Sequence, residues 1–222
     1  MPSSLETHGP ISPPFDFNHP NVSRFSPEVT GRLLINSMCK RLGWPSLAGK
    51  RLLDFGCGVR FARTIFNLEI EIGQYVGIDV NAAPIAWLKA NVPDARFQFE
   101  HLDMRNPMYN PGGQDCGAEA LVSMGLAGFD GACMFSVITH QNPLEAGIIF
   151  SMLRLCAQRL YFTAFVDDNL GDYAEGAPES LRMRSTFPTF LIRDLLAKTG
   201  WHVDSVHGPS PFQQTAFVCS PA

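Results

Sequence analysis

The chain has 222 residues, 45% of them hydrophobic and 17% charged, which is enough apolar material for a buried core and excludes a disordered polypeptide. The formal net charge is -4 and no basic stretch stands out, so a nucleic-acid partner receives no electrostatic support. The six cysteines form no CxxC pair, which removes the usual spacing of metal ligands and indicates reduced, buried thiols in a cytoplasmic protein.

The amino-terminal segment predicts neither a secretion signal nor a membrane span. It lacks a basic stretch followed by an apolar one, and no apolar run in the chain approaches the ~18 residues that cross a bilayer. Residues 1–25 are rich in Pro, Ser and His. They predict a flexible N-terminal arm, followed by a single domain over residues 26–222.

The first helix is expected over residues 26–43. Ser26 can cap its amino end, Pro27 suits its first turn and Gly43 can end it. Apolar residues recur at helical spacing and predict one buried face, made by Val29, Leu33, Leu34, Met38 and Leu42.

Beyond this helix, short apolar strands alternate with helices. The strands are expected over residues 51–55, 75–80, 96–103, 129–138 and 159–166. The helices are expected over residues 60–69, 83–92, 142–158 and 189–200. Asn142 and Glu145, at the start of the third of these helices, are spaced as a capping box. Two further strands, 201–207 and 214–220, have a short connection that favours an antiparallel pair.

This order of elements predicts an α/β fold. We expect a doubly wound Rossmann-like sheet, mostly parallel with an antiparallel C-terminal strand pair, and helices on both faces. Two irregular stretches, at about residues 104–128 and 167–186, are expected to be lid-like loops.

Three successive strands are expected to end in an aspartate: Asp54, Asp79 and Asp103. In an open α/β sheet, ligands bind beyond the carboxyl ends of the strands. Gly56 and Gly58 allow the backbone to turn tightly and approach a ligand, and the following helix adds N–H donors. Asp79 can accept hydrogen bonds from the hydroxyls of a ribose, and Asp103 can accept one from the amine of an adenine. These residues therefore predict a site for a cofactor that carries adenosine.

The pattern resembles the class I S-adenosylmethionine-dependent methyltransferases. The resemblance is carried by Asp-x-Gly-x-Gly at residues 54–58, by the acids after the second and third strands, and by the closing helix and strand pair. The segment FSVITH, residues 135–140, resembles the stretch after the fourth strand of many members. The resemblance implies S-adenosylmethionine as cofactor, S-adenosylhomocysteine as product, and methyl transfer by in-line displacement.

The resemblance also implies which residues hold the cofactor. Gly56, Cys57 and Gly58 would line its methionine part, with Asp54 structuring that loop or contacting the amino group. The remaining positions are Asp79 at the ribose, Val80 and Met104 flanking the adenine, Asp103 at its amine, and Phe135 after the fourth strand.

One position departs from the family, and two other functions stay open. Members usually have a third glycine, whereas this chain reads GCGVRFAR: either Arg60 replaces that glycine or one residue has been lost before the arginine. A cofactor-binding protein that has lost catalysis is therefore one alternative. An NAD(P)-dependent oxidoreductase is less favoured, because its Gly-x-Gly-x-x-Gly fingerprint would need glycine at Phe61 and its first strand has no use for Asp54.

The acceptor side offers two candidates. His140 follows the fourth strand and could act as general base or orient a substrate, or it could instead pack against the start of the next helix. Tyr173 lies in the second irregular stretch and could contact a substrate. Without a basic face or an Asn-Pro-Pro-Tyr-type signature, a small-molecule acceptor is expected, with no nucleic acid, membrane or metal involved. Monomer and homodimer are both compatible with the sequence.

Overall fold

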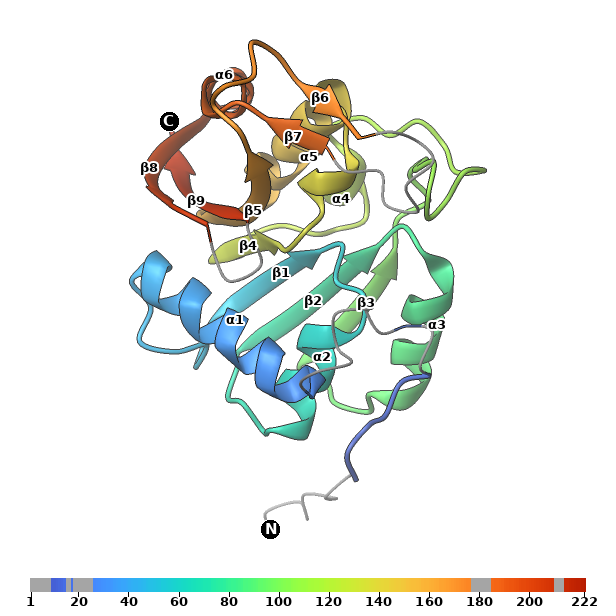
Figure 1. Cartoon of the computed structure of the whole chain (residues 1–222). Coiled ribbons are helices and arrows are strands. Elements are labelled where there is room, and N and C mark those ends of the chain that lie inside the picture. Colours follow the sequence, from blue (N-terminus) through green and yellow to red (C-terminus); the bar gives the residue numbers. More distant parts are fainter. Residues whose placement is uncertain (1–8, 15–16, 18–25, 177–184, 210–213) are drawn as a thin grey trace.

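The computed structural model describes residues 9–14, 17, 26–176, 185–209 and 214–222. Nine strands in this part form one sheet in the order β3-β2-β1-β4-β5-β7-β6, and β9 pairs with both β5 and β8 (Figure 1). The strands are β1 (Arg51–Phe55), β2 (Gln74–Asp79), β3 (Phe97–His101), β4 (Gly131–Met134), β5 (Leu160–Val166), β6 (Ala174–Glu175), β7 (Ser185–Phe187), β8 (Trp201–His207) and β9 (Thr215–Pro221).

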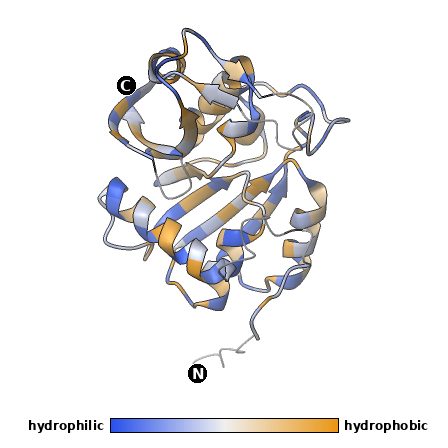
Figure 2. Ribbon diagram, in the orientation of Figure 1, coloured by the Kyte–Doolittle hydropathy of each residue, from blue (hydrophilic) through white to orange (hydrophobic). Residues whose placement is uncertain are grey.

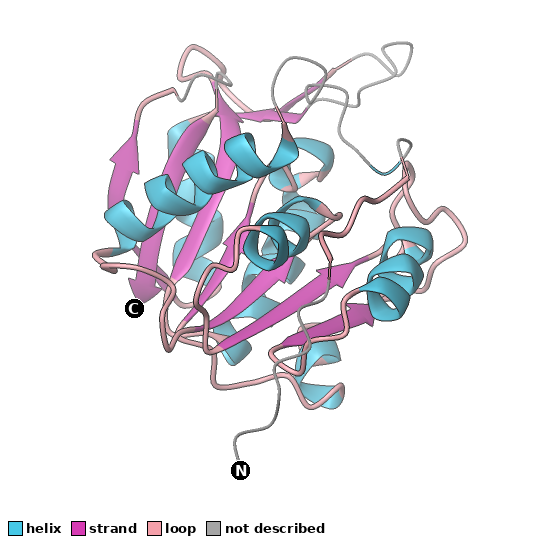
Figure 3. Cartoon of the chain, turned by 90° about the horizontal axis from the view of Figure 1, so that it is seen from below, coloured by secondary structure: helices cyan, strands magenta, loops and turns pink. Residues whose placement is uncertain are grey.

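Helices cover both faces of this sheet (Figures 1 and 3). They are α1 (Pro27–Leu42), α2 (Arg60–Asn67), α3 (Ala82–Asn91), α4 (Ala120–Ser123), α5 (Pro143–Cys156) and α6 (Thr189–Lys198), with a short 3-10 turn η3 (Ile138–His140). Side chains of α1, α2 and α3 form one apolar core with the sheet, and those of α4, α5 and α6 form a second. Hydrophobic residues run along the central strands between these two layers (Figure 2).

The sheet confirms the predicted fold class. β1 pairs in parallel with β2 and β4, β2 with β3, and β4 with β5, whereas β9 runs antiparallel to β5 and β8. The chain steps outward from β1 to β3 and then returns to place β4 on the other side of β1. The strand order therefore reverses between β1 and β4, which is where open α/β sheets bind ligands.

The ends of α1 are as predicted, but only part of its predicted face is buried. The Ser26 hydroxyl accepts from the Val29 amide, and Gly43 ends the helix in a left-handed conformation. Val29 and Leu33, expected inside, are 51% and 65% exposed. The helix is rotated because it crosses α2 closely at Gly31, where a Cβ would lie 2.0 Å from the Thr64 Oγ1. Met38 and Leu42 are buried as predicted, together with Gly31, Ile35 and Cys39.

The strand expected over residues 129–138 is shorter than predicted. β4 ends at Met134, because Ser136 has a φ of 61° and turns the chain out of the sheet. The helix after it begins as expected: the side chain of Asn142 accepts from the Glu145 amide, and that of Glu145 accepts from the Asn142 amide, so the capping box is confirmed.

Both stretches expected to be irregular contain short regular elements. In the first, Met104 bridges to Gln114, Asn106 bridges to Asn110, and α4 follows. In the second, β6 pairs antiparallel with β7, and β7 adds in parallel to the end of β5. Residues 177–184 of this stretch lie outside the described part.

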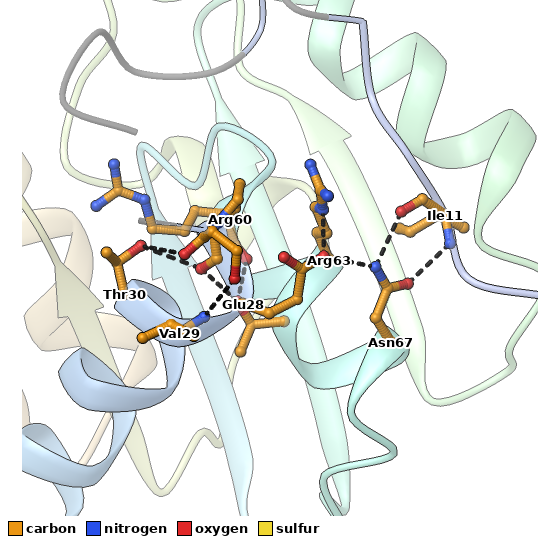
Figure 4. Close-up of polar contacts among 10 residues, drawn as sticks. Ile11, Glu28, Val29, Thr30, Arg60, Arg63 and Asn67 are labelled. Atoms are coloured by element: carbon orange, nitrogen blue, oxygen red, sulfur yellow. Dashed lines mark hydrogen bonds and ion pairs between the residues drawn. The ribbon is translucent and has the colours of Figure 1, made fainter. Parts of the chain in front are cut away.

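Part of the predicted N-terminal arm is fixed to the domain. The Ile11 amide donates to the side chain of Asn67 (2.8 Å), whose own amide donates back to the Ile11 carbonyl (2.9 Å). Asn67 also donates to Glu28, which forms a 2.6 Å ion pair with Arg63 (Figure 4). Residues 1–8, 15–16 and 18–25 lie outside the described part, so the flexibility of the arm stays a prediction for them.

No helix in the described ranges has both the length and the apolar character needed to cross a membrane.

Candidate cofactor site

A two-glycine turn joins β1 to α2. Gly56 and Gly58 have φ values of 72° and 49°, in the region that glycine adopts without strain. The amides of Gly56 and Cys57 both donate to the carbonyl of Ile78 in β2, which fixes the turn against the neighbouring strand. A Cβ on Gly58 would meet nothing within 4 Å, so the backbone there borders open space.

The helical start at Arg60 explains the missing third glycine. Arg60 is the first residue of α2, and the preceding Val59 has a φ of -121°. Neither position requires the left-handed backbone for which a glycine would be selected. The guanidinium of Arg60 is partly buried, and this burial lowers its pKa.

Asp79 holds the glycine turn. Its Oδ2 accepts from the Gly58 amide (2.8 Å), and its Oδ1 accepts from the Asn81 amide at the start of α3 (2.9 Å). Burial raises its pKa, while these backbone hydrogen bonds and the nearby His101 oppose the rise. The His101 ring nitrogen in turn lies 3.1 Å from the Val80 carbonyl. The Asp79 carboxylate therefore lies beside the glycine turn, and its binding of a ribose stays a prediction.

Asp54 is enclosed rather than presented at the strand end. It is 4% exposed, its Oδ2 accepts from the Tyr75 hydroxyl (2.6 Å) and its Oδ1 from the Cys133 thiol (3.5 Å). Burial raises its pKa to about 6 against the effect of these two hydrogen bonds. The Cys57 side chain is also in the core, where its sulfur lies close to Gly77 of β2. These hydrogen bonds tie Asp54 to the neighbouring strands β2 and β4, and its two predicted roles at the cofactor stay predictions.

The third acid lies at the outer end of the site. Asp103 is exposed, and its Oδ1 accepts from the Asn110 side chain (2.9 Å). Met104 beside it is 6% exposed and belongs to the core on the α4–α6 side, against which Val80 also packs. Asp79, Val80, Asp103 and Met104 therefore lie at the carboxyl ends of the neighbouring strands β2 and β3.

A strained turn follows β4. Ser136, at its positive φ, donates its amide to the Thr163 Oγ1 (3.0 Å), and its carbonyl accepts from the Thr139 hydroxyl (2.6 Å). Gln214 joins this cluster by donating its amide to the Ser136 hydroxyl (2.9 Å). The turn presses Val137 against the glycine turn, because a Cβ on Gly56 would lie 2.4 Å from a Val137 methyl.

Phe135 and His140 flank this turn. The Phe135 ring packs edge-on against Phe61 (4.8 Å between ring centres) and lies tilted against Tyr161 (5.3 Å), on the α1–α2 side of the sheet. The half-buried His140 ends η3, and its ring meets that of Tyr109 edge-on at 5.8 Å. Partial burial and, after it, the charge of Asp79 raise the pKa of Tyr109.

Tyr173 is tied to the β6–β7 hairpin. Its hydroxyl lies 3.1 Å from the Ser185 hydroxyl and its ring packs on Phe187. This places Tyr173 beside β7 at the end of β5.

The sequence did not single out Tyr75, Cys133, Ser136 or Gln214. Tyr75 and Cys133 occur in apolar strands, and the register that sets them beside Asp54 is visible only in the assembled sheet. A serine in a left-handed conformation leaves no sequence signal, unlike a glycine.

A hollow of about 420 Å³ lies elsewhere, against α1, and is lined by Trp44 and Leu47 among others. Trp44 packs against Gly131, the first residue of β4. This hollow is therefore at the amino ends of the strands, opposite the glycine turn, and is not part of the site. The described residues bring together no group of three His, Cys, Asp or Glu side chains able to hold a metal ion.

The fold is that of the class I S-adenosylmethionine-dependent methyltransferases. The 1,6-didemethyltoxoflavin-N1-methyltransferase of Burkholderia thailandensis, with S-adenosylhomocysteine bound, is similar over 88% of this chain and 79% of its own, with a TM-score of 0.60 and 18% identity. The magnesium protoporphyrin IX methyltransferase of Synechocystis, also with S-adenosylhomocysteine, is similar over 88% and 83%, with a TM-score of 0.57 and 17% identity.

An amino pentose methyltransferase of Micromonospora echinaspora with bound S-adenosylmethionine is similar over 91% of this chain and 94% of its own, with a TM-score of 0.58 and 12% identity. No family model matches the sequence. At these identities the likeness establishes the fold, and the function rests on the site.

Proposed function

We propose that this protein transfers the methyl group of S-adenosylmethionine to a small-molecule acceptor. The observation that carries the proposal is the hydrogen bond from the Gly58 amide to Asp79. It joins the acid that ends β2 to the glycine turn after β1, and β1 borders the point where the strand order reverses. The three solved methyltransferases with S-adenosylmethionine or its product bound support the same cofactor.

The residues present fit this cofactor. Gly58 borders open space, so its backbone can approach a ligand without a side chain intervening. Asp79 would bind the ribose, Val80 and Met104 would flank the adenine, and Asp103, which is exposed, would accept from its amine. When bound, the cofactor supplies a methyl group on a positively charged sulfur, so the protein mainly has to bind, align and exclude water. Alignment alone can contribute roughly 7–11 kcal/mol to lowering the barrier.

We place the binding site of the methyl acceptor around η3. His140, in ring contact with Tyr109, would take the proton of an oxygen or nitrogen acceptor or orient that acceptor. Tyr173 would contact the acceptor from the β6–β7 hairpin. The porphyrin, toxoflavin and amino pentose named for the similar enzymes support a small molecule. All six cysteines are free thiols, five of them buried, which supports a reducing, cytoplasmic setting.

Calorimetric titration with S-adenosylmethionine, S-adenosylhomocysteine and NAD tests the cofactor assignment. We expect the first two ligands to bind and NAD not to bind. Asp79→Ala should weaken the binding at least tenfold, because it removes both a ligand group and the acceptor of the Gly58 amide. Asp194→Ala, which removes an exposed acid of α6 paired with Lys198, is the matched control and should bind as the parent does. Failure of the parent to bind either methionine derivative would overturn the proposal.

A screen of small-molecule acceptors for release of S-adenosylhomocysteine would test turnover. With an accepted substrate, His140→Ala should lower kcat by roughly 10²- to 10⁴-fold if proton removal limits the step. His202→Ala changes an exposed histidine of β8 and should leave kcat unchanged. Full turnover by His140→Ala would exclude His140 as the base.

A further inference from the structure

The Asp54 carboxylate is held by side chains from both strands that neighbour its own. It lies on β1, while Tyr75 donates from β2 (2.6 Å) and Cys133 donates from β4 (3.5 Å). Asp54 is 4% exposed and Tyr75 and Cys133 are fully buried. Both partners are uncharged, so hydrogen bonds are what stabilise a negative charge at this position.

Asp54 is close to the glycine turn of the proposed cofactor site, both in the sequence and in the sheet. It precedes Gly56 by two residues, and the charge of Asp79, which holds Gly58, acts on it. S-adenosylmethionine carries two positive groups, a sulfonium and an ammonium. A fixed negative charge behind the glycine turn would favour their binding, because interactions between charges are strong where water is excluded.

We propose that Tyr75 is a positioning residue of the cofactor site: its hydroxyl keeps the Asp54 carboxylate ionised and fixed behind the glycine turn, so that its charge supports binding of the cationic cofactor. This inference rests on the proposed function. It assigns a role to a strand residue that does not itself touch the ligand.

The groups around Asp54 set the pH at which this support is lost. Tyr75 faces it from β2 and Cys133 from β4, while the charges of Asp79, at the end of β2, and of Asp54 both act on the Cys57 thiol in the turn. Burial raises the pKa of Asp54 to about 6 and Asp79 adds to this rise, whereas the bonds from Tyr75 and Cys133 oppose it. Loss of the Tyr75 hydroxyl therefore moves protonation of Asp54 toward neutral pH.

The test is calorimetric titration of S-adenosylmethionine and S-adenosylhomocysteine at several pH values between about 5.5 and 8. In the parent, affinity should rise as the pH increases through about 6, because Asp54 ionises there. In Tyr75→Phe this rise should move upward by roughly one to two pH units, and affinity at pH 7 should fall by roughly two- to tenfold. The titrations of the ligand and of Asp79, whose pKa is also raised by burial, occur in all variants, so the differences between variants report Asp54.

Two further variants separate this role from a merely structural one. Asp54→Asn removes the titrating group, so its affinity should be low and should lack the rise near pH 6; adding Tyr75→Phe to it should change nothing further. Tyr161→Phe is the matched control, since it removes another buried tyrosine hydroxyl, one that accepts from Arg41, and its profile should follow the parent.

The outcomes distinguish the inference from the proposed function. If the parent binds neither ligand at any pH, the proposed function fails. If the parent binds and the Tyr75→Phe profile superimposes on it, the inference is wrong and the function stands. Should Tyr75→Phe not fold, Cys133→Ala removes the other donor and should displace the profile in the same direction by less.

Discussion

The carboxylate of Asp79 lies 2.8 Å from the backbone nitrogen of Gly58, so the acid that ends β2 holds the glycine turn that follows β1. The two groups are 21 residues apart in the chain and are brought together by the parallel pairing of their strands. A cofactor bound at Asp79, as proposed, would therefore be coupled to the conformation of the turn.

The two glycines of this turn should differ in their tolerance of a side chain. Gly58→Ala introduces only the left-handed backbone, since its Cβ meets nothing, and should lower the free energy of unfolding by about 1–2 kcal/mol. Gly56→Ala adds a clash with Val137 and should lower it by roughly 2–5 kcal/mol. Urea unfolding measures both. Adding Val137→Ala should recover part of the loss in Gly56→Ala; no recovery would mean that the clash is not its cause.

Ser136 should respond differently to glycine and to alanine. Both substitutions remove the hydroxyl to which Gln214 donates. Alanine keeps the strain of a φ of 61°, whereas glycine relieves it. Ser136→Ala should therefore be less stable than Ser136→Gly by about 1–2 kcal/mol in thermal or urea unfolding. Equal stabilities would show that the positive φ at this turn carries no strain.

The elements were predictable from the sequence to the extent that local signals define them. β1 and β8 have the expected bounds, and the caps at Ser26 and Asn142 are where the side chains suggested. These features depend on hydrogen bonds between residues three or four positions apart, or on short apolar runs, both of which are visible in a sequence.

What could not be predicted depends on contacts between distant segments. Leu33 points outward because α1 meets α2 through Gly31, and β4 stops early because Thr163 and Gln214 hold Ser136 in a turn. The three acids were predicted as site residues from the sequence pattern, but the enclosure of Asp54 by Tyr75 and Cys133 follows from strand register.

Asn67 should control how firmly the segment around Ile11 is attached. Its side chain makes two hydrogen bonds to the Ile11 backbone, so Asn67→Ala removes both. Amide hydrogen exchange in residues 9–14, followed by mass spectrometry, should accelerate by roughly tenfold or more. Asn91→Ala, which removes an exposed side chain bonded only within its own helix end, serves as the control and should leave this exchange unchanged.

The Glu28 ion pair should stabilise the fold only when the carboxylate is charged. Burial alone would raise the pKa of Glu28, but hydrogen bonds from Asn67 and Arg63 outweigh this effect and lower the pKa. An acid with a lowered pKa contributes stability that is present above its ordinary value of about 4.5 and is lost as the pH falls through the folded-state value. Glu28→Gln should thus be about 1 kcal/mol less stable than the parent at pH 7 and no less stable near pH 3. A difference that persists in acid would mean that packing, not charge, is what Glu28 contributes.

Asp54 should have the opposite effect on stability. Its pKa is raised from 3.8 to about 6, mainly by burial, so the folded protein binds a proton that the unfolded chain has released. Stability therefore decreases as the pH rises from about 4 to 6, by up to about 3 kcal/mol, and levels off above this range. Asp54→Asn, which has no charge to bury and keeps an oxygen to accept from Tyr75, should lack this decrease.

Urea unfolding of the parent and of Asp54→Asn at pH 4.5 and 7 is the measurement. We expect the free energy of unfolding of Asp54→Asn to increase relative to that of the parent as the pH increases, even though the variant should bind the cofactor less well. The buried charge would then be maintained at the expense of stability, as is common for groups that serve a site rather than the fold. If the difference in stability between the parent and Asp54→Asn were the same at pH 7 as at pH 4.5, Asp54 would be ionised at both pH values. The hydrogen bonds from Tyr75 and Cys133 would then outweigh the effect of burial on the pKa of Asp54.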